Sequence, residues 1–194
     1  MFENLRRDAS AYKMDGGWCG HPGFWIIAVY RLGMWAHSFD SPFLRIPLWI
    51  LYRVARVPLR IFNVDLWAGA KGARIGPGLR LIHPSNIIIA RDVEIGSDCL
   101  IFHEVTPGTG NIPGRPKIGN NVDIYPGARI LGGVVIGDRS MIGANCVVTT
   151  DVPADFVVVP PPSRILPKAL SPVARRGAAP GAPEPQRRRE SSEA

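Results

Sequence analysis

The sequence predicts a solenoid of short β-strands preceded by a helical region, and three observations lead to this fold class. Aliphatic residues recur at every sixth position along the middle of the chain. Gly 21 and Pro 19 together make up about a fifth of the 194 residues, which favours a fold rich in turns. The first sixty or so residues carry apolar side chains at helical spacing instead.

The period of six is the strongest pattern in the chain. Every sixth residue from 118 onward is aliphatic: Ile118, Ile124, Ile130, Ile136, Ile142 and Val148. The same period links Ile89, Ile95 and Ile101. An α-helix has 3.6 residues per turn and would not repeat at six, whereas short strands joined by tight turns would. We therefore expect stacked coils with these side chains turned inward.

The phase of this repeat breaks twice, between Leu81 and Ile89 and between Ile101 and Ile118. The backbone must therefore leave the coil near 82–88 and near 106–117. We expect the second excursion to form a protruding loop. Loops on a rigid scaffold commonly carry binding and catalytic residues, so candidates are sought at both breaks.

The chain divides into three predicted regions. Residues 1–63 form the helical region, 64–168 the solenoid, and 169–194 a basic, Pro-rich tail that we expect to be disordered. Within the first region, a helix that begins at Ser41-Pro42 has an apolar run interrupted by arginines at 45, 53, 56 and 60. We interpret it as packed on its own domain or on a partner subunit, with peripheral contact to an anionic membrane as the alternative.

The composition limits the classes of partner. A net charge of +7 suits nucleic acid, an anionic membrane or an anionic small molecule such as a nucleotide or coenzyme A, but no nucleic-acid-reading motif appears. Cys19, Cys99 and Cys146 lack metal spacing and are expected to be reduced thiols of a cytoplasmic protein without a metal. The polar first residues predict no signal peptide, and no apolar stretch predicts a spanning helix.

Several motifs resemble the hexapeptide-repeat acyltransferases and, within them, the serine acetyltransferase branch. They are Ile75-Gly76-x-Gly78 with His83, Val105-Thr106, Gly108-Thr109-Gly110, Pro116-Lys117-Ile118-Gly119 and Ile142-Gly143-Ala144-Asn145. The helical region matches through Asp8, Gly23-Phe24 and Tyr30-Arg31, so the resemblance covers residues 5–166. It implies a mainly β fold, a left-handed parallel β-helix with about five coils of 18 residues. It also implies a homotrimer with sites between neighbouring subunits, and a hexamer stays open.

The resemblance implies acetyl transfer from acetyl-CoA to a hydroxyl, with L-serine as the leading acceptor and cysteine biosynthesis as the pathway. An alcohol is a poor nucleophile and needs a base to take its proton. His83, at the first phase break, matches the family's catalytic His. Asp65 resembles the Asp of the family's dyad and precedes His83 by 18 residues, so in a regular coil the two side chains would stack. Glu104 is the fallback carboxylate.

Acceptor recognition departs from the family pattern. Asp8 is the candidate for the acceptor's ammonium and Arg115 for its carboxylate. His103 lies close to one coil after His83 and either lines the same cleft or decorates a strand. Relatives have Asp directly before the catalytic His, where this chain has Ile82. The alternatives are therefore an O-acetyltransferase acting on a saccharide or natural-product hydroxyl, and an inactive trimeric β-helix scaffold.

Coenzyme A is expected along the later coils. The candidate contacts are glycine and alanine turns that let pantetheine approach the backbone, a neighbouring threonine, and cations for the phosphates: Gly108, Thr109, Gly110, Lys117, Ala144 and Arg164. Relatives dock a C-terminal Ile into the next enzyme of cysteine synthesis. This sequence ends Ser-Ser-Glu-Ala, so no sulfhydrylase complex is expected through that end.

Overall fold

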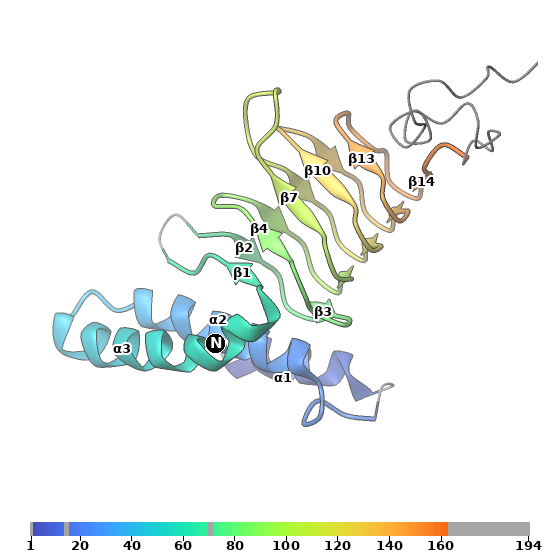
Figure 1. Cartoon of the computed structure of the whole chain (residues 1–194). Helices are drawn as coiled ribbons and strands as arrows, with labels where there is room; N and C mark the ends of the chain where they lie inside the picture. Colours follow the sequence, from blue (N-terminus) through green and yellow to red (C-terminus); the bar gives the residue numbers. More distant parts are fainter. Residues whose placement is uncertain (1, 14–15, 70–71, 163–194) are drawn as a thin grey trace, which may run out of the picture. The chain divides into compact units, whose positions relative to one another are not determined.

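The computed structural model describes residues 2–13, 16–69 and 72–162. Residues up to 160 form one compact unit, and the fold described here is that unit (Figure 1). The predicted tail, 169–194, and Arg164 lie outside the described residues.

Three helices precede the strands. They are α1 (Phe2–Ala11), α2 (Pro22–His37) and α3 (Pro42–Leu59), followed by a short 3-10 helix, η2 (Arg60–Phe62). Proline in the first turn of α2 and of α3 costs no hydrogen bond there, because the first backbone N–H groups of a helix have no partner inside it. The helix α3 continues through Pro47 and ends one residue after Pro58. Asn63 then turns the chain toward the strands in the left-handed region, with φ of 49°.

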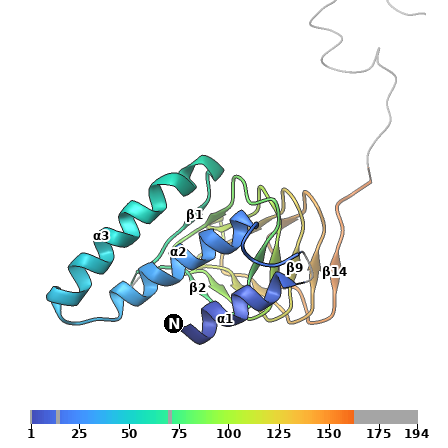
Figure 2. The same cartoon turned by 90° about the horizontal axis from the view of Figure 1, so that it is seen from below.

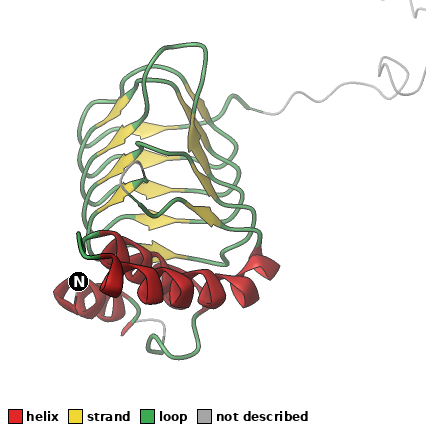
Figure 3. Cartoon of the chain, turned by 90° about the vertical axis from the view of Figure 1, so that its left-hand side faces the viewer, coloured by secondary structure: helices red, strands yellow, loops and turns green. Residues whose placement is uncertain are grey.

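The strands form a parallel β-helix with three faces, as the period of six predicts (Figure 3). The first face holds β1 (Asp65–Leu66), β4 (Ile88–Ile89), β7 (Thr106–Gly108), β10 (Arg129–Leu131) and β13 (Val147–Val148). The second holds β2 (Arg74–Ile75), β5 (Glu94–Ile95), β8 (Lys117–Ile118) and β11 (Val135–Ile136). The third holds β3 (Arg80–Leu81), β6 (Leu100–Ile101), β9 (Asp123–Ile124), β12 (Met141–Ile142) and β14 (Val157–Val158).

The aliphatic residues of the repeat fill the interior of the coils. Ile118 pairs with Ile136, Ile124 with Ile142 and Ile130 with Val148, so the predicted 18-residue coil is confirmed for these later coils. The earlier coils are longer, because Ile75 pairs with Ile95 and Leu81 with Ile101. All six of these side chains are buried. The excursion within the third coil is shorter than predicted, because residues 106–108 and 117 belong to β7 and β8 and only 109–116 protrude. Gly132 and Gly133 of the next coil leave room for this loop, since a Cβ at Gly133 would lie 2.4 Å from the oxygen of Pro113.

The helices cover the first coil, whose strands would otherwise expose unpaired backbone groups. Figure 3 shows them across one end of the stack, and α2 lies between α1 and α3 (Figure 2). The hydroxyl of Tyr30 donates to the oxygen of Ala73 at 2.6 Å, and Arg31 donates to the oxygens of Ile75 and Gly76 at 2.6 Å. The N–H of Leu81 donates to the hydroxyl of Tyr12 at 2.8 Å. These side chains complete the hydrogen bonding of the open edge and fix α1 and α2 to it.

Candidate active site

His83 lies at the corner between the third and first faces, directly after β3. Its backbone is in the left-handed region, with φ of 48°, and its side chain is exposed. Beside it is a hollow of about 520 Å³. The lining residues come from the start of α2, from η2 and from the corner itself: His21, Pro22, Gly23, Phe62, Leu81, Ile82, His83, Pro84 and Ser85. The predicted catalytic His therefore opens into a space that can hold a small molecule.

His103 lies at the same corner, one coil further on. Leu81 pairs with Ile101, so the residues two positions later, His83 and His103, occupy equivalent places. The Nδ1 atom of His103 is buried and has no hydrogen-bond partner among the described residues. Glu104 belongs to this corner too, because its N–H donates to the oxygen of Ser85 at 2.8 Å, and its side chain is exposed.

Asp65 does not stack on His83, and that prediction is wrong. The register of β1 and β4 pairs Asp65 with Ile88, because the chain adds residues to the first coil before it returns to the first face. An Oδ1 atom of Asp65 accepts a hydrogen bond from Nη2 of Arg56 at 2.8 Å. No hydrogen bond joins Asp65 to His83 within the part of the chain that the structure describes.

Asp8, the candidate for the acceptor's ammonium, does not line the hollow. Its side chain is fully buried. Its two oxygens accept hydrogen bonds from Nε and Nη2 of Arg31, at 2.9 and 3.2 Å, and from the N–H of Gly78 at 2.8 Å. The pair joins α1, α2 and the turn after β2, which makes Asp8 a structural residue.

Arg115 lies on the protruding loop, at the corner between the first and second faces. Its Nε donates to the oxygen of Arg91 at 3.0 Å, and the residue is half-buried. The chain crosses the first face as β4 between His83 and Arg91, so the two corners are the opposite edges of that face. One chain therefore does not bring Arg115 to the hollow beside His83.

The candidate contacts for coenzyme A divide between the same two corners. Gly108 ends β7, Thr109 and Gly110 follow it at the corner of the protruding loop, and Lys117 begins β8 on the second face. Ala144 follows β12 by two residues, and the register from Leu81 through Ile101 and Ile124 to Ile142 places it on the edge that carries His83. No single surface of one chain collects all these contacts.

Among the described residues, neither the buried cysteines nor a cluster of metal ligands offers a second reactive site. Burial raises the pKa of the Cys99 thiol to about 11 and raises the pKa of Cys146 as well, so both stay protonated at neutral pH. Among the described residues, no group of three or more His, Cys, Asp or Glu side chains could hold a metal ion. No helix in the described ranges has the length and apolarity needed to cross a membrane.

His21, which no sequence motif singled out, lines the hollow together with His83. Its ring packs against that of Tyr12, with centroids 5.4 Å apart. Its position directly before Pro22 could have indicated a role in the site, because the residue that precedes a helix lies at the positive end of the helix dipole. Phe62 was missed because no period relates the helical region to the coils.

The family model for bacterial transferase hexapeptide (six repeats) matches residues 115–150. The serine acetyltransferase of Helicobacter pylori is 35% identical over 142 residues, which cover 72% of this chain and 78% of that protein. The serine acetyltransferase of Synechococcus elongatus is 34% identical over 149 residues, which cover 75% of this chain and 57% of that protein. The chain thus spans little more than half the length of some relatives.

Solved structures show the same fold. Serine acetyltransferase of Brucella abortus in complex with coenzyme A superposes with a TM-score of 0.66 and 29% identity, over 84% of this chain and 66% of that one. The Neisseria gonorrhoeae enzyme in complex with serine gives a TM-score of 0.64 and 28% identity, over 84% and 68%. The predicted fold class, a left-handed parallel β-helix preceded by helices, is therefore confirmed. By sequence and by fold, the chain belongs to the serine acetyltransferase family.

Proposed function

We propose that the protein transfers the acetyl group of acetyl-CoA to the hydroxyl of L-serine, with His83 as the general base. The observation that carries this proposal is the place of His83. It is an exposed His at a corner of the β-helix, it opens into a hollow of about 520 Å³, and the chain belongs to the serine acetyltransferase family. The relatives' names and their complexes with coenzyme A and serine support the same reaction.

The reaction needs one proton transfer in each direction. His83 accepts the hydroxyl proton as the oxygen attacks the carbonyl carbon of the thioester. The C–S bond then breaks, and the departing sulfur takes the proton from His83. O-acetylserine and free coenzyme A leave, and the imidazole returns to its neutral form. A base in this role contributes about 10²- to 10⁴-fold in rate.

We further propose that the complete site lies between two chains of a homotrimer. The edge with His83, His103 and Ala144 is separated by a whole face from the edge with Arg115, Gly108 and Gly110. Sites that use both edges need one edge from each of two neighbouring copies. A hexamer built from two such trimers stays an alternative.

The residues that line the hollow beside His83 indicate which kind of acceptor it can bind. The start of α2, at His21, Pro22 and Gly23, directs the positive end of the helix dipole into it, which favours a carboxylate such as that of serine. Its described lining residues include no carboxylate for an ammonium group. That second observation favours a neutral saccharide hydroxyl, which is our alternative acceptor.

The three cysteines are free thiols, which suits the cytoplasm as the compartment.

The experiment that tests this proposal follows thiol release from acetyl-CoA with L-serine, L-homoserine and a panel of sugars as acceptors. We expect turnover with L-serine, and a fall of about 10²- to 10⁴-fold in kcat for His83→Ala. His37→Ala is the matched control, because His37 bonds the oxygen of Gly33 within α2 and should retain activity.

Each other outcome has a meaning. Turnover with sugars alone would select the alternative acceptor. An unchanged rate in His83→Ala would remove His83 as the base. Bound coenzyme A without turnover of any acceptor would support an inactive scaffold.

The shared site has its own test. Inactive His83→Ala and Arg115→Ala proteins are mixed, dissociated and reassembled. If the site lies between chains, mixed trimers contain some sites with both residues intact, and about a quarter of the activity returns. If activity stays absent, His83 and Arg115 do not act across one interface.

A further inference from the structure

The helix α3 presents three different faces along its length. Residues at its inner seam, which pack on α2 and the first coil, are buried or half-buried: Leu48, Tyr52, Ala55 and Leu59. A stripe beside this seam is basic and carries Arg45, Arg53 and Arg56, with Arg60 directly after the helix. The outer face is apolar and exposed: Phe43, Ile46, Ile50, Val54 and Val57. Phe43 is 89% exposed and Val57 is 64% exposed, so no other part of this unit covers this face.

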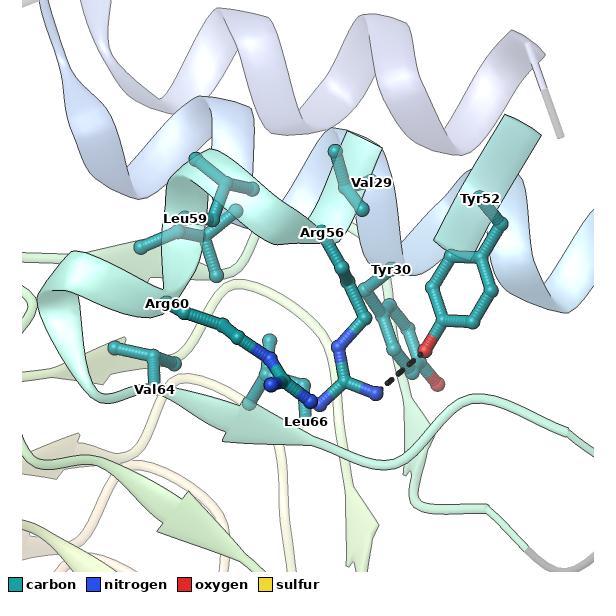
Figure 4. Close-up of a pocket in the computed structure, with 9 residues that line it drawn as sticks. Val29, Tyr30, Tyr52, Arg56, Leu59, Arg60, Val64 and Leu66 are labelled. Carbon is teal, nitrogen blue, oxygen red and sulfur yellow. Dashed lines mark hydrogen bonds between the residues drawn. The ribbon is translucent and has the colours of Figure 1, made fainter. Parts of the chain in front are cut away.

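Basic charge predominates around this face, although Asp40 lies exposed just before α3. Neither α2 nor α3 contains Asp or Glu. Arg56 is paired with Asp65, but Arg45, Arg53 and Arg60 have no carboxylate partner among the described residues. Figure 4 shows the side chains of Arg56 and Arg60 reaching toward the same place beside β1. Two guanidinium groups therefore gather where one carboxylate is available.

Two hollows lie where the basic stripe meets the apolar face. One, of about 320 Å³, is lined by Arg53, Val54, Arg56, Val57 and Arg60. The other, of about 250 Å³, is lined by His37, Arg45, Ile46 and Trp49. The first places three guanidinium groups beside aliphatic side chains, and the second places one beside an aliphatic and an aromatic side chain. This combination matches a molecule with a phosphate at one end and hydrocarbon at the other.

We propose that α3 docks the protein onto a bilayer that contains anionic phospholipid. The outer apolar face enters the boundary between headgroups and acyl chains, and the arginines bind lipid phosphates at its side. A second copy that packs its own α3 against this face fits less well, because neither helix carries an acidic residue to offset the arginines. No residue of α3 lines the hollow beside His83, so docking leaves that hollow open.

The test measures sedimentation of the full-length protein with vesicles of phosphatidylcholine alone or mixed with phosphatidylglycerol. We expect binding to the mixed vesicles, weaker binding in 0.5 M salt, and little binding to phosphatidylcholine alone. Arg45→Glu/Arg53→Glu should lower the partition coefficient by at least about 30-fold, since each basic charge near an anionic surface contributes about fivefold. Ile50→Ser/Val54→Ser should also weaken binding, because it removes apolar surface that enters the bilayer.

A matched control separates a specific surface from overall charge. Arg6→Glu/Arg129→Glu makes the same change in net charge at exposed positions on α1 and β10, and it should bind nearly as well as the parent protein. Equal loss in both pairs of variants would overturn the proposal, as would equal binding to both kinds of vesicle or no binding at all. Sedimentation velocity completes the test. If Ile50→Ser/Val54→Ser lowers the oligomeric state in the absence of lipid, the face is covered by a second copy and the membrane proposal is wrong.

Discussion

The β-helix buries most of its inward apolar residues, whereas the helix α3 leaves most of its apolar residues exposed. In the coils, the inward residue of nearly every strand is buried, and the stack makes a continuous core from Leu66 to Val152. In α3, an 18-residue helix rich in apolar residues, Tyr52 alone is fully buried. The difference teaches that the coils stabilise one another, whereas α3 leaves apolar surface exposed within the described residues. Between them, α1 and α2 are fixed to the first coil by buried hydrogen bonds.

The largest expected effect concerns the ion pair that joins the helices to the coils. Asp8→Ala leaves Arg31 buried without its carboxylate and should lower the free energy of unfolding by about 3–5 kcal/mol. The matched change is Asp65→Ala, which removes a half-exposed pair with Arg56 and should cost about 0–1 kcal/mol. Urea unfolding measures both. Equal costs would mean that burial does not distinguish the two pairs.

The second expected effect compares one isoleucine from each region. Ile124→Ala opens a cavity in the fully buried core and should cost about 2–5 kcal/mol of unfolding free energy. Ile50→Ala on the exposed face of α3 should change it by less than about 0.5 kcal/mol in the absence of lipid. Denaturant titrations of the two variants test this. A large cost for Ile50→Ala in monomeric protein would show that α3 is already covered.

A smaller effect is expected where α2 meets β3. A Cβ at Gly23 would lie 2.2 Å from the backbone oxygen of Leu81, so Gly23→Ala must shift the helix and should cost about 1–3 kcal/mol. Gly20→Ala, with nothing within 4 Å of its Cβ, is the control and should be close to neutral. Thermal unfolding checks the pair. Similar melting temperatures for both variants would argue against close contact between α2 and the first coil.

The smallest effect is one of reactivity and leaves stability unchanged. Cys19 in the helical region is exposed, whereas Cys99 and Cys146 are buried in the coils. Since burial raises the pKa of Cys99 to about 11, its thiolate is scarce at pH 8 and becomes common only as the pH rises through that value. Alkylation of folded protein at pH 8, followed by mass spectrometry, should modify Cys19 first. Rapid labelling of Cys99 under native conditions would show that the coils open.

The sequence predicted the coils well because each coil repeats the same local rule. Ile118 and Ile136 are 18 residues apart and do pair, since inward aliphatic residues and tight turns recur without interruption there. The same rule wrongly predicted that Asp65 stacks on His83. The chain inserts residues at a phase break, so no regular coil separates the two residues. The packing of Asp8 could not be predicted from the sequence for a different reason. Its partners, Arg31 and Gly78, are brought together by tertiary packing, which no local period encodes.

Catalysis is assigned here to the β-helix and membrane docking to α3. The most direct test sediments the protein with phosphatidylglycerol vesicles and then assays acetyl transfer to L-serine in the pellet and in the supernatant. The parent protein should carry its activity into the pellet, and Arg45→Glu/Arg53→Glu should leave the same total activity in the supernatant. His83→Ala should enter the pellet without activity. Parent activity that stays in the supernatant would contradict docking through α3. Activity in neither fraction would contradict the proposed reaction.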